Sequence, residues 1–140
     1  TYTQDQWLGH VPMKRDEIKQ RNTIRVIHEP DYMWRLEGKE NPTLIGLLCA
    51  TEHLTVGKVY LQPGQHSDVQ VHGGDESLYV VEGTLHMQVH DGQRPSWFEL
   101  KSGDGFYVPH GVEHQCYNIG DKPVSFVCGI APNYLPPTNE

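Results

Sequence analysis

The sequence lacks several features that would place it in a membrane, secreted or disulfide-rich class. It has no run of 18 apolar residues, so no segment is long enough to span a bilayer as a helix. Its first residues carry no apolar signal core. The chain has only three cysteines, which cannot all pair, so we expect no disulfide framework and a cytoplasmic protein. The absence of an initiator Met leaves open whether the chain is part of a longer protein.

Positive charge is also scarce. The 140 residues include 11 Lys and Arg against 18 Asp and Glu, and the formal net charge is −7. The basic residues are scattered and form no stripe, so a polyanion would be repelled. We therefore expect no nucleic-acid and no membrane partner, and a small molecule as substrate.

Helical periodicity is weak throughout, and only residues 12–20 are predicted to form a short helix. Short apolar or alternating runs recur instead, separated by Gly, Pro and Asp turns. Many short strands without βα alternation predict an all-β fold, either a sandwich or a barrel. The strands are expected at residues 24–27, 44–48, 54–61, 67–72, 76–81, 84–90, 97–100, 106–108, 115–118 and 124–130.

The organisation predicted from this pattern is one domain with two extensions. Residues 1–45 are expected to be an irregular N-terminal arm, residues 46–132 a barrel, and residues 133–140 a tail. A small barrel leaves sheet edges exposed. We therefore predict that the arm packs across a two-fold partner and that the protein is a homodimer.

Nine histidines are many for this length, and some of them are spaced so that they can converge. Residues two apart in a strand project to the same side, so Gln70 and His72 point together. The glycine turn at residues 73–75 reverses the chain before Glu76, and His114 follows a later turn. These four side chains could meet at one point inside a barrel.

Two imidazoles and one carboxylate favour a single divalent metal ion: Zn, Mn, Fe, Ni or Co. The amide oxygen of Gln70 would be a neutral fourth ligand. With neutral histidines these donors carry a charge of only −1, so the ion would remain a strong Lewis acid with open positions.

The spacing around these residues resembles the two signature motifs of the cupin superfamily. The first motif is matched at Gly64, Gln70, His72, Glu76 and Gly83, with Gln70 where a histidine is usual. The second is matched in full at Gly103, Pro109, Gly111, His114 and Asn118. The resemblance implies a jelly-roll β-barrel with Gln70, His72, Glu76 and His114 as metal ligands. The ligand set is also similar to that of zinc-dependent mannose-6-phosphate isomerases, which are much longer chains.

Other residues near the motifs are candidates for the pocket. Strand parity places His66 on the ligand side, where it is a weak candidate for a catalytic base or a substitute ligand; a solvated loop position is the alternative. The remaining pocket candidates, each of which could instead pack in the core or face water, are Tyr60, His86, Gln88, Tyr107 and Cys116.

Three functions are compatible with such a site, because one fold hosts many chemistries. The first is a metal-dependent isomerase, epimerase or lyase that acts on a small hydroxylated or sugar-like carbonyl compound. The second is a metal-dependent dioxygenase, since two histidines and one carboxylate suit oxygen activation. The third is a non-catalytic module that binds a small ligand.

Overall fold

The computed structural model describes residues 25–90, 92 and 94–136 of the 140-residue chain, so the helix predicted at residues 12–20 lies outside it. The described part forms a six-stranded sheet, ordered β1-β2-β3-β9-β4-β7, and a three-stranded sheet, ordered β6-β5-β8. The elements are η1 (Glu29–Asp31), β1 (Met33–Glu37), β2 (Thr43–Ala50), β3 (Thr55–Leu61), β4 (Asp75–Glu82), β5 (Thr84–His90), β6 (Ser96–Lys101), β7 (Gly105–Val108), β8 (Glu113–Tyr117) and β9 (Val124–Ala131). All strand pairs within the two sheets are antiparallel, which confirms the all-β jelly-roll prediction.

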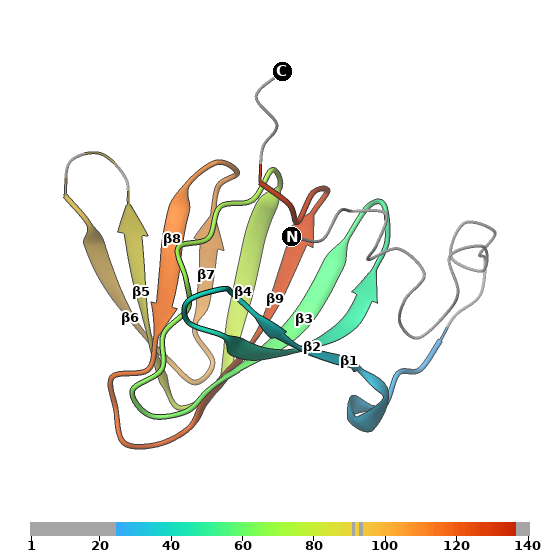
Figure 1. Cartoon of the computed structure of the whole chain (residues 1–140), viewed down its shortest axis with the longest axis horizontal. Helices are drawn as coiled ribbons and strands as arrows, with labels where there is room; N and C mark the ends of the chain where they lie inside the picture. Colours follow the sequence, from blue (N-terminus) through green and yellow to red (C-terminus); the bar gives the residue numbers. More distant parts are fainter. Residues whose placement is uncertain (1–24, 91, 93, 137–140) are drawn as a thin grey trace.

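The core lies between the two sheets. In Figure 1 strands β5, β6 and β8 lie together on one side of the molecule, and β1, β2 and β3 on the other. Burial alternates along β3 and along most of β5, as expected for strands with one face on a core. Leu61 from one sheet and Leu85 from the other are both fully buried. Apolar burial of this kind is the main force that holds the sheets together.

The turn between β4 and β5 requires glycine. Gly83 has a φ of +80°, and a Cβ added there would lie 2.5 Å from the Pro123 carbonyl oxygen. Only a residue without a side chain meets both conditions. This turn carries the chain from the six-stranded sheet to the three-stranded one.

Strand β1 lies inside the arm that was expected to be irregular, and for residues 33–37 that expectation is wrong. Its exposed face carries Trp34 and Leu36, which are 40 % and 64 % exposed. Its other face carries Arg35 and Glu37, which pair with the buried Ile45 and Thr43 of β2. The alternation was missed because the polar residues of β1 point inward. The strand predicted at residues 24–27 is also wrong for the described residues 25–27, which form no strand.

The segment before β4 differs from prediction as well. Residues 67–72 form no strand. Instead, two isolated bridges join this region to β8: His66 pairs with Tyr117, and Gln70 pairs with His114. The first members of the bridges are four positions apart, whereas their partners are three positions apart. One residue therefore bulges between them, and the bulge reverses the side to which the chain before it points.

Residues 133–135 of the C-terminal tail lie against the segment that precedes β4. The backbone N–H of Gly73 donates to the Leu135 carbonyl at 2.7 Å, and that of Gly74 donates to the Asn133 carbonyl at 2.8 Å. Tyr134 packs against the core. Among the described residues, no helix has the length and hydropathy needed to cross a membrane.

Candidate metal centre

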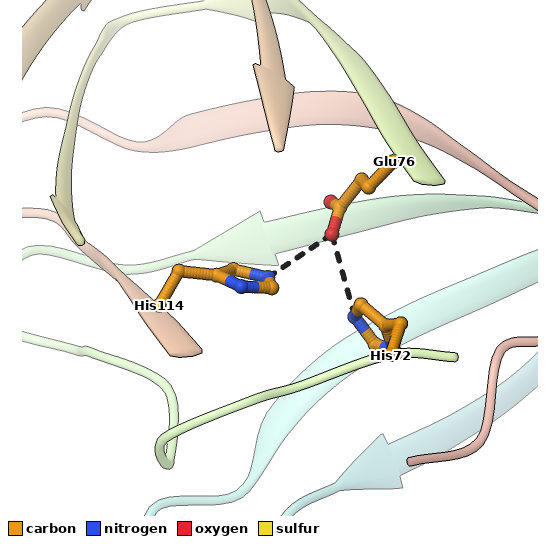
Figure 2. Close-up of side chains that lie close together, drawn as sticks. All are labelled: His72, Glu76 and His114. Atoms are coloured by element: carbon orange, nitrogen blue, oxygen red, sulfur yellow. Dashed lines mark ion pairs between the residues drawn. The ribbon is translucent and has the colours of Figure 1, made fainter. Parts of the chain in front are cut away.

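Three buried side chains from separate parts of the fold meet between the sheets. Glu76 comes from β4, His114 from β8, and His72 from the segment that precedes β4. Oε1 of Glu76 lies 3.0 Å from Nε2 of His114 and 3.3 Å from Nε2 of His72. Figure 2 shows both rings directed at this one oxygen. All three ligand atoms lie within 4.8 Å of one another, an arrangement that could hold a metal ion.

The other ring nitrogens show which tautomers are present. Nδ1 of His114 lies 2.9 Å from the Val112 carbonyl, and Nδ1 of His72 contacts the Tyr134 carbonyl. A carbonyl oxygen only accepts, so each Nδ1 must carry the proton and donate. In the neutral ring, Nε2 is then left with a lone pair that points toward Glu76.

These atoms fit a bound cation. Oε1 of Glu76 and Nε2 of His114 are buried and have no hydrogen-bond partner within the described part of the chain. Lone pairs that face one another away from water are unfavourable unless a proton or a metal ion lies between them. Two imidazoles and a carboxylate suit a divalent transition metal, so the donor chemistry and the unpaired atoms agree.

The charge of Glu76 also suits a metal ligand. Burial alone would raise the pKa of Glu76, but His114 and His72 outweigh it and lower this pKa to about 2. Burial lowers the pKa of His114, but the adjacent Glu76 outweighs burial and raises that pKa above its ordinary value. Glu76 is therefore a carboxylate at neutral pH.

His72, Glu76 and His114 line a small cavity of about 20 Å³. A space of this size holds about one water molecule or one metal ion. Gln70, the predicted fourth ligand, lines the same cavity. Its backbone exchanges two hydrogen bonds with that of His114, at 2.8 and 2.9 Å, which holds residue 70 next to His114. Ligation by Gln70 remains a prediction.

Among the lining residues that sequence reasoning did not single out are Glu37 and Tyr134. Oε1 of Glu37 is buried and has no hydrogen-bond partner among the described residues, while the Tyr134 side chain hydrogen-bonds to the same carboxyl group. Burial raises the pKa of Glu37 above its ordinary value. The sequence does contain a signal for Glu37: in β1, Trp34 and Leu36 alternate with polar residues, a pattern typical of a strand.

The candidate base His66 does not lie at the cavity. Its ring stacks on Tyr117 with centroids 4.9 Å apart, and its Nδ1 contacts the Ser67 carbonyl at 2.9 Å. Tyr117 is three positions from the inward His114 on β8, so its side chain points to the opposite, outer face. Because directly paired residues share one face of a sheet, His66 points outward with Tyr117. The bulge between His66 and Gln70 therefore turns His66 to the outer face, contrary to simple strand parity.

Among the pocket candidates, Cys116 lines the cavity, and burial raises the pKa of its thiol to about 11. Tyr60 points outward, where its hydroxyl donates to Glu29 at 2.8 Å. Tyr107 also points outward and is 59 % exposed. Neither tyrosine reaches the three ligands.

His86 and Gln88 lie on the outer face of β5. Nε2 of His86 is 3.6 Å from a carboxylate oxygen of Glu99, and the Gln88 amide oxygen accepts from the Tyr117 hydroxyl at 3.4 Å. Both residues contribute to the outer surface of the three-stranded sheet rather than to the cavity.

A larger cleft of about 500 Å³ adjoins the cavity. It lies between the end of β1, residues 68–72 and the C-terminal residues 134–136. Four residues line both spaces: Glu37, Gln70, His72 and Tyr134. The volume is typical of small-molecule sites, so the cleft can hold a ligand whose end reaches toward the cavity.

Comparison with known proteins agrees with this fold and site. A profile of the Cupin_2 family, described as Cupin domain, matches residues 57–130. That span is more than half of the chain, and it contains His72, Glu76 and His114. The protein belongs to the cupin family, which confirms the resemblance seen in the sequence motifs.

Individual relatives are more distant. The chain is 30 % identical to polyketide synthase CurC of Streptomyces cyaneus over 78 residues, which cover 55 % of this chain and 48 % of CurC. An RmlC-like cupin from Shewanella frigidimarina superposes with a TM-score of 0.64 at 23 % identity, covering 79 % of this chain and 92 % of that one. The polyketide cyclase RemF from Streptomyces resistomycificus has a TM-score of 0.64 at 17 % identity, covering 79 % and 80 %. The two structural matches establish the fold alone, and the chain spans about half the length of CurC.

Proposed function

We propose that this protein is a metal-dependent enzyme that moves a proton on a small carbonyl compound, as isomerases, epimerases and lyases do. The observation that carries the proposal is the presence, in one cavity, of three converging metal ligands and the unpaired carboxyl oxygen of Glu37. A bound divalent ion would act as a Lewis acid toward a carbonyl oxygen. Its identity stays open among Zn, Mn, Fe, Ni and Co.

Glu37 is the residue of this chain best placed to transfer the proton. Glu37 lines the cavity, and its buried Oε1 has no hydrogen-bond partner among the described residues, while the Tyr134 side chain holds the carboxyl group by a hydrogen bond. Burial raises the pKa of this carboxyl group, which makes it a stronger base than an exposed glutamate. Glu37 therefore replaces His66 as the proposed base.

The walls of the cleft support a substrate with an apolar part. Glu37, Gln70, His72 and Tyr134 line the part of the cleft that it shares with the cavity. The remainder is mixed: its apolar side chains are Leu36, Val69, Val71, Leu135 and Pro136, and its charged ones are Lys39 and Asp68. The sequence similarity to polyketide synthase CurC is in keeping with a carbonyl compound.

The test is proton exchange in D₂O, measured by NMR on a panel of small ketones and hydroxyketones with and without added Mn²⁺ or Zn²⁺. Metal-dependent deuterium uptake that is abolished by a chelator and restored by metal supports the proposal. Glu37→Gln should lower the exchange rate by roughly 10²- to 10⁴-fold, the range of general-base catalysis. The matched control is Glu40→Gln, which changes an exposed carboxylate just beyond β1. Equal exchange by the metal-free protein would rule the proposal out.

A dioxygenase is the second candidate, because His72, Glu76 and His114 form a set of two histidines and one carboxylate. Oxygen uptake by the iron-loaded protein with phenolic or enol substrates would favour it. Metal analysis of protein purified without added metal separates the two classes: zinc or manganese favours proton transfer, and iron favours oxygenation. Tight ligand binding without any turnover would instead identify a binding module.

A cytoplasmic location is part of the same proposal. The three cysteines, Cys49, Cys116 and Cys128, are free thiols in the structure, in keeping with a reducing compartment. Fractionation of cells that produce the protein tests this directly.

A further inference from the structure

The C-terminal segment contacts the ligand-bearing segment through consecutive residues on both sides. His72, Gly73 and Gly74 donate, in turn, to the carbonyls of Tyr134, Leu135 and Asn133. The bonds from the two glycines measure 2.7 and 2.8 Å. We name residues 133–135 the C-terminal clamp.

The clamp reaches the metal ligand itself. The carbonyl of Tyr134 accepts the Nδ1 proton of His72, and the Tyr134 ring lies 4.9 Å from the imidazole. His72 lies outside every strand of the described fold, so its ring is not held by a sheet ladder as those of β8 are. The clamp therefore supplies the contacts that set the tautomer and the direction of this ring.

Close approach of the clamp depends on Gly74. A Cβ at this position would lie 2.5 Å from the carbonyl carbon and oxygen of Ala131, and 2.8 Å from the backbone nitrogen of Asn133. These are backbone atoms, which cannot move aside without displacing the segment. A glycine is thus required for the clamp to reach His72.

We propose that the C-terminal clamp positions His72 for metal binding, so that the metal affinity of the centre depends on residues beyond the barrel. This inference rests on the metal dependence of the proposed function but not on the reaction. Hydrogen bonds to the second nitrogen of a metal-bound histidine typically change metal affinity by roughly 10- to 100-fold. The clamp residues are positioning residues, because they act through His72.

Two pairs of variants test the clamp in the full protein. Gly74→Ala pushes the clamp away, and its control is Gly129→Ala, where an added Cβ meets nothing within 4 Å. Deletion of residues 133–140 removes the clamp, and its control is deletion of residues 137–140. Each protein is titrated with Co²⁺, and the affinity and the visible d–d absorption spectrum are recorded.

Gly74→Ala and the longer deletion should bind Co²⁺ roughly 10- to 100-fold more weakly and show a changed spectrum. The two controls should match the unaltered protein. Nitrogen NMR of the unaltered protein should show the His72 proton on Nδ1. If the longer deletion does not fold, the Gly74→Ala pair and the NMR measurement still decide.

Unchanged affinity and spectrum in the clamp variants would overturn the clamp and leave the metal centre standing. A His72 proton on Nε2 in the unaltered protein would also overturn it. Absence of Co²⁺ binding by the unaltered protein would overturn the clamp and the metal dependence together. Normal binding with no proton exchange on any substrate would count against the proposed reaction alone.

Discussion

Glu76 and His114 belong to different sheets, yet Oε1 of the first lies 3.0 Å from Nε2 of the second, with both atoms buried. The pair joins β4 and β8 across the interior of the barrel. Neither atom has a hydrogen-bond partner among the described residues, so a bound cation would satisfy both.

Replacement of Glu76 by Gln should abolish metal retention. The amide keeps the shape of the side chain but removes the negative charge that faces the two imidazoles. The measurement is metal content after purification, by elemental analysis. Glu82→Gln, at the exposed end of β4, is the control and should retain the metal of the unaltered protein. Equal metal content in the Glu76 variant would contradict its role as ligand.

Gln70 offers a graded test of the fourth ligand. Gln70→His restores the usual cupin residue and should tighten binding, because imidazole is a stronger donor than an amide oxygen to these metals. Gln70→Ala should weaken binding. Affinities are compared by chelator competition, with Val69→Ala as the neighbouring control. Identical affinities for all four proteins would show that residue 70 does not contact the ion.

Leu85→Ala should destabilise the fold by about 2–5 kcal/mol, since this side chain is fully buried between the sheets and the surrounding core cannot close the cavity completely. Urea unfolding measures the change in free energy. The control is Leu36→Ala, at a site that is 64 % exposed, where a change within about 0.5 kcal/mol is expected. A similar loss at both sites would contradict the assignment of the core.

Glu29 should give the fold a measurable pH dependence. Hydrogen bonds from Lys58 and Tyr60, each 2.8 Å long, lower the pKa of Glu29 below its ordinary 4.5. Its stabilising effect is therefore complete above pH 4.5 and is lost as the pH falls through the lower pKa of the folded state. Glu29→Gln should unfold at lower urea than the unaltered protein at pH 7, and the difference should shrink in acid. Glu52→Gln, also exposed, is the control; a difference independent of pH would contradict the mechanism.

The six-stranded sheet offers a candidate interface for the predicted homodimer. The outer face of the six-stranded sheet carries Trp34, Leu44, Tyr79 and Tyr107, which are 40–59 % exposed. Burial of such side chains is a common basis for association. Sedimentation at micromolar concentration should show a dimer, and a monomer would refute the prediction. Residues 1–24, which were expected to reach across the partner, lie outside the described structure.

Most of the fold follows from local patterns that the sequence displays openly. Residues 55–61 and 84–90 alternate as half-buried strands do, and both form the expected strands. The spacing of His72, Glu76 and His114 within the two motifs was enough to predict that they converge. Such features are readable because side-chain direction in a strand depends only on parity as long as the ladder is regular.

Tertiary structure decided the rest, where that regularity fails or where contact comes from distant chain. A single bulge between His66 and Gln70 reverses parity, so the residue expected at the pocket faces outward. Glu37 turns inward because pairing with β2 places it there, although its neighbours give an apolar face to solvent. Tyr134 reaches His72 from 62 positions away. The sequence by itself therefore determined which atoms could bind a metal, while only the packing of remote segments determined which groups surround it, because those contacts have no local period to reveal them.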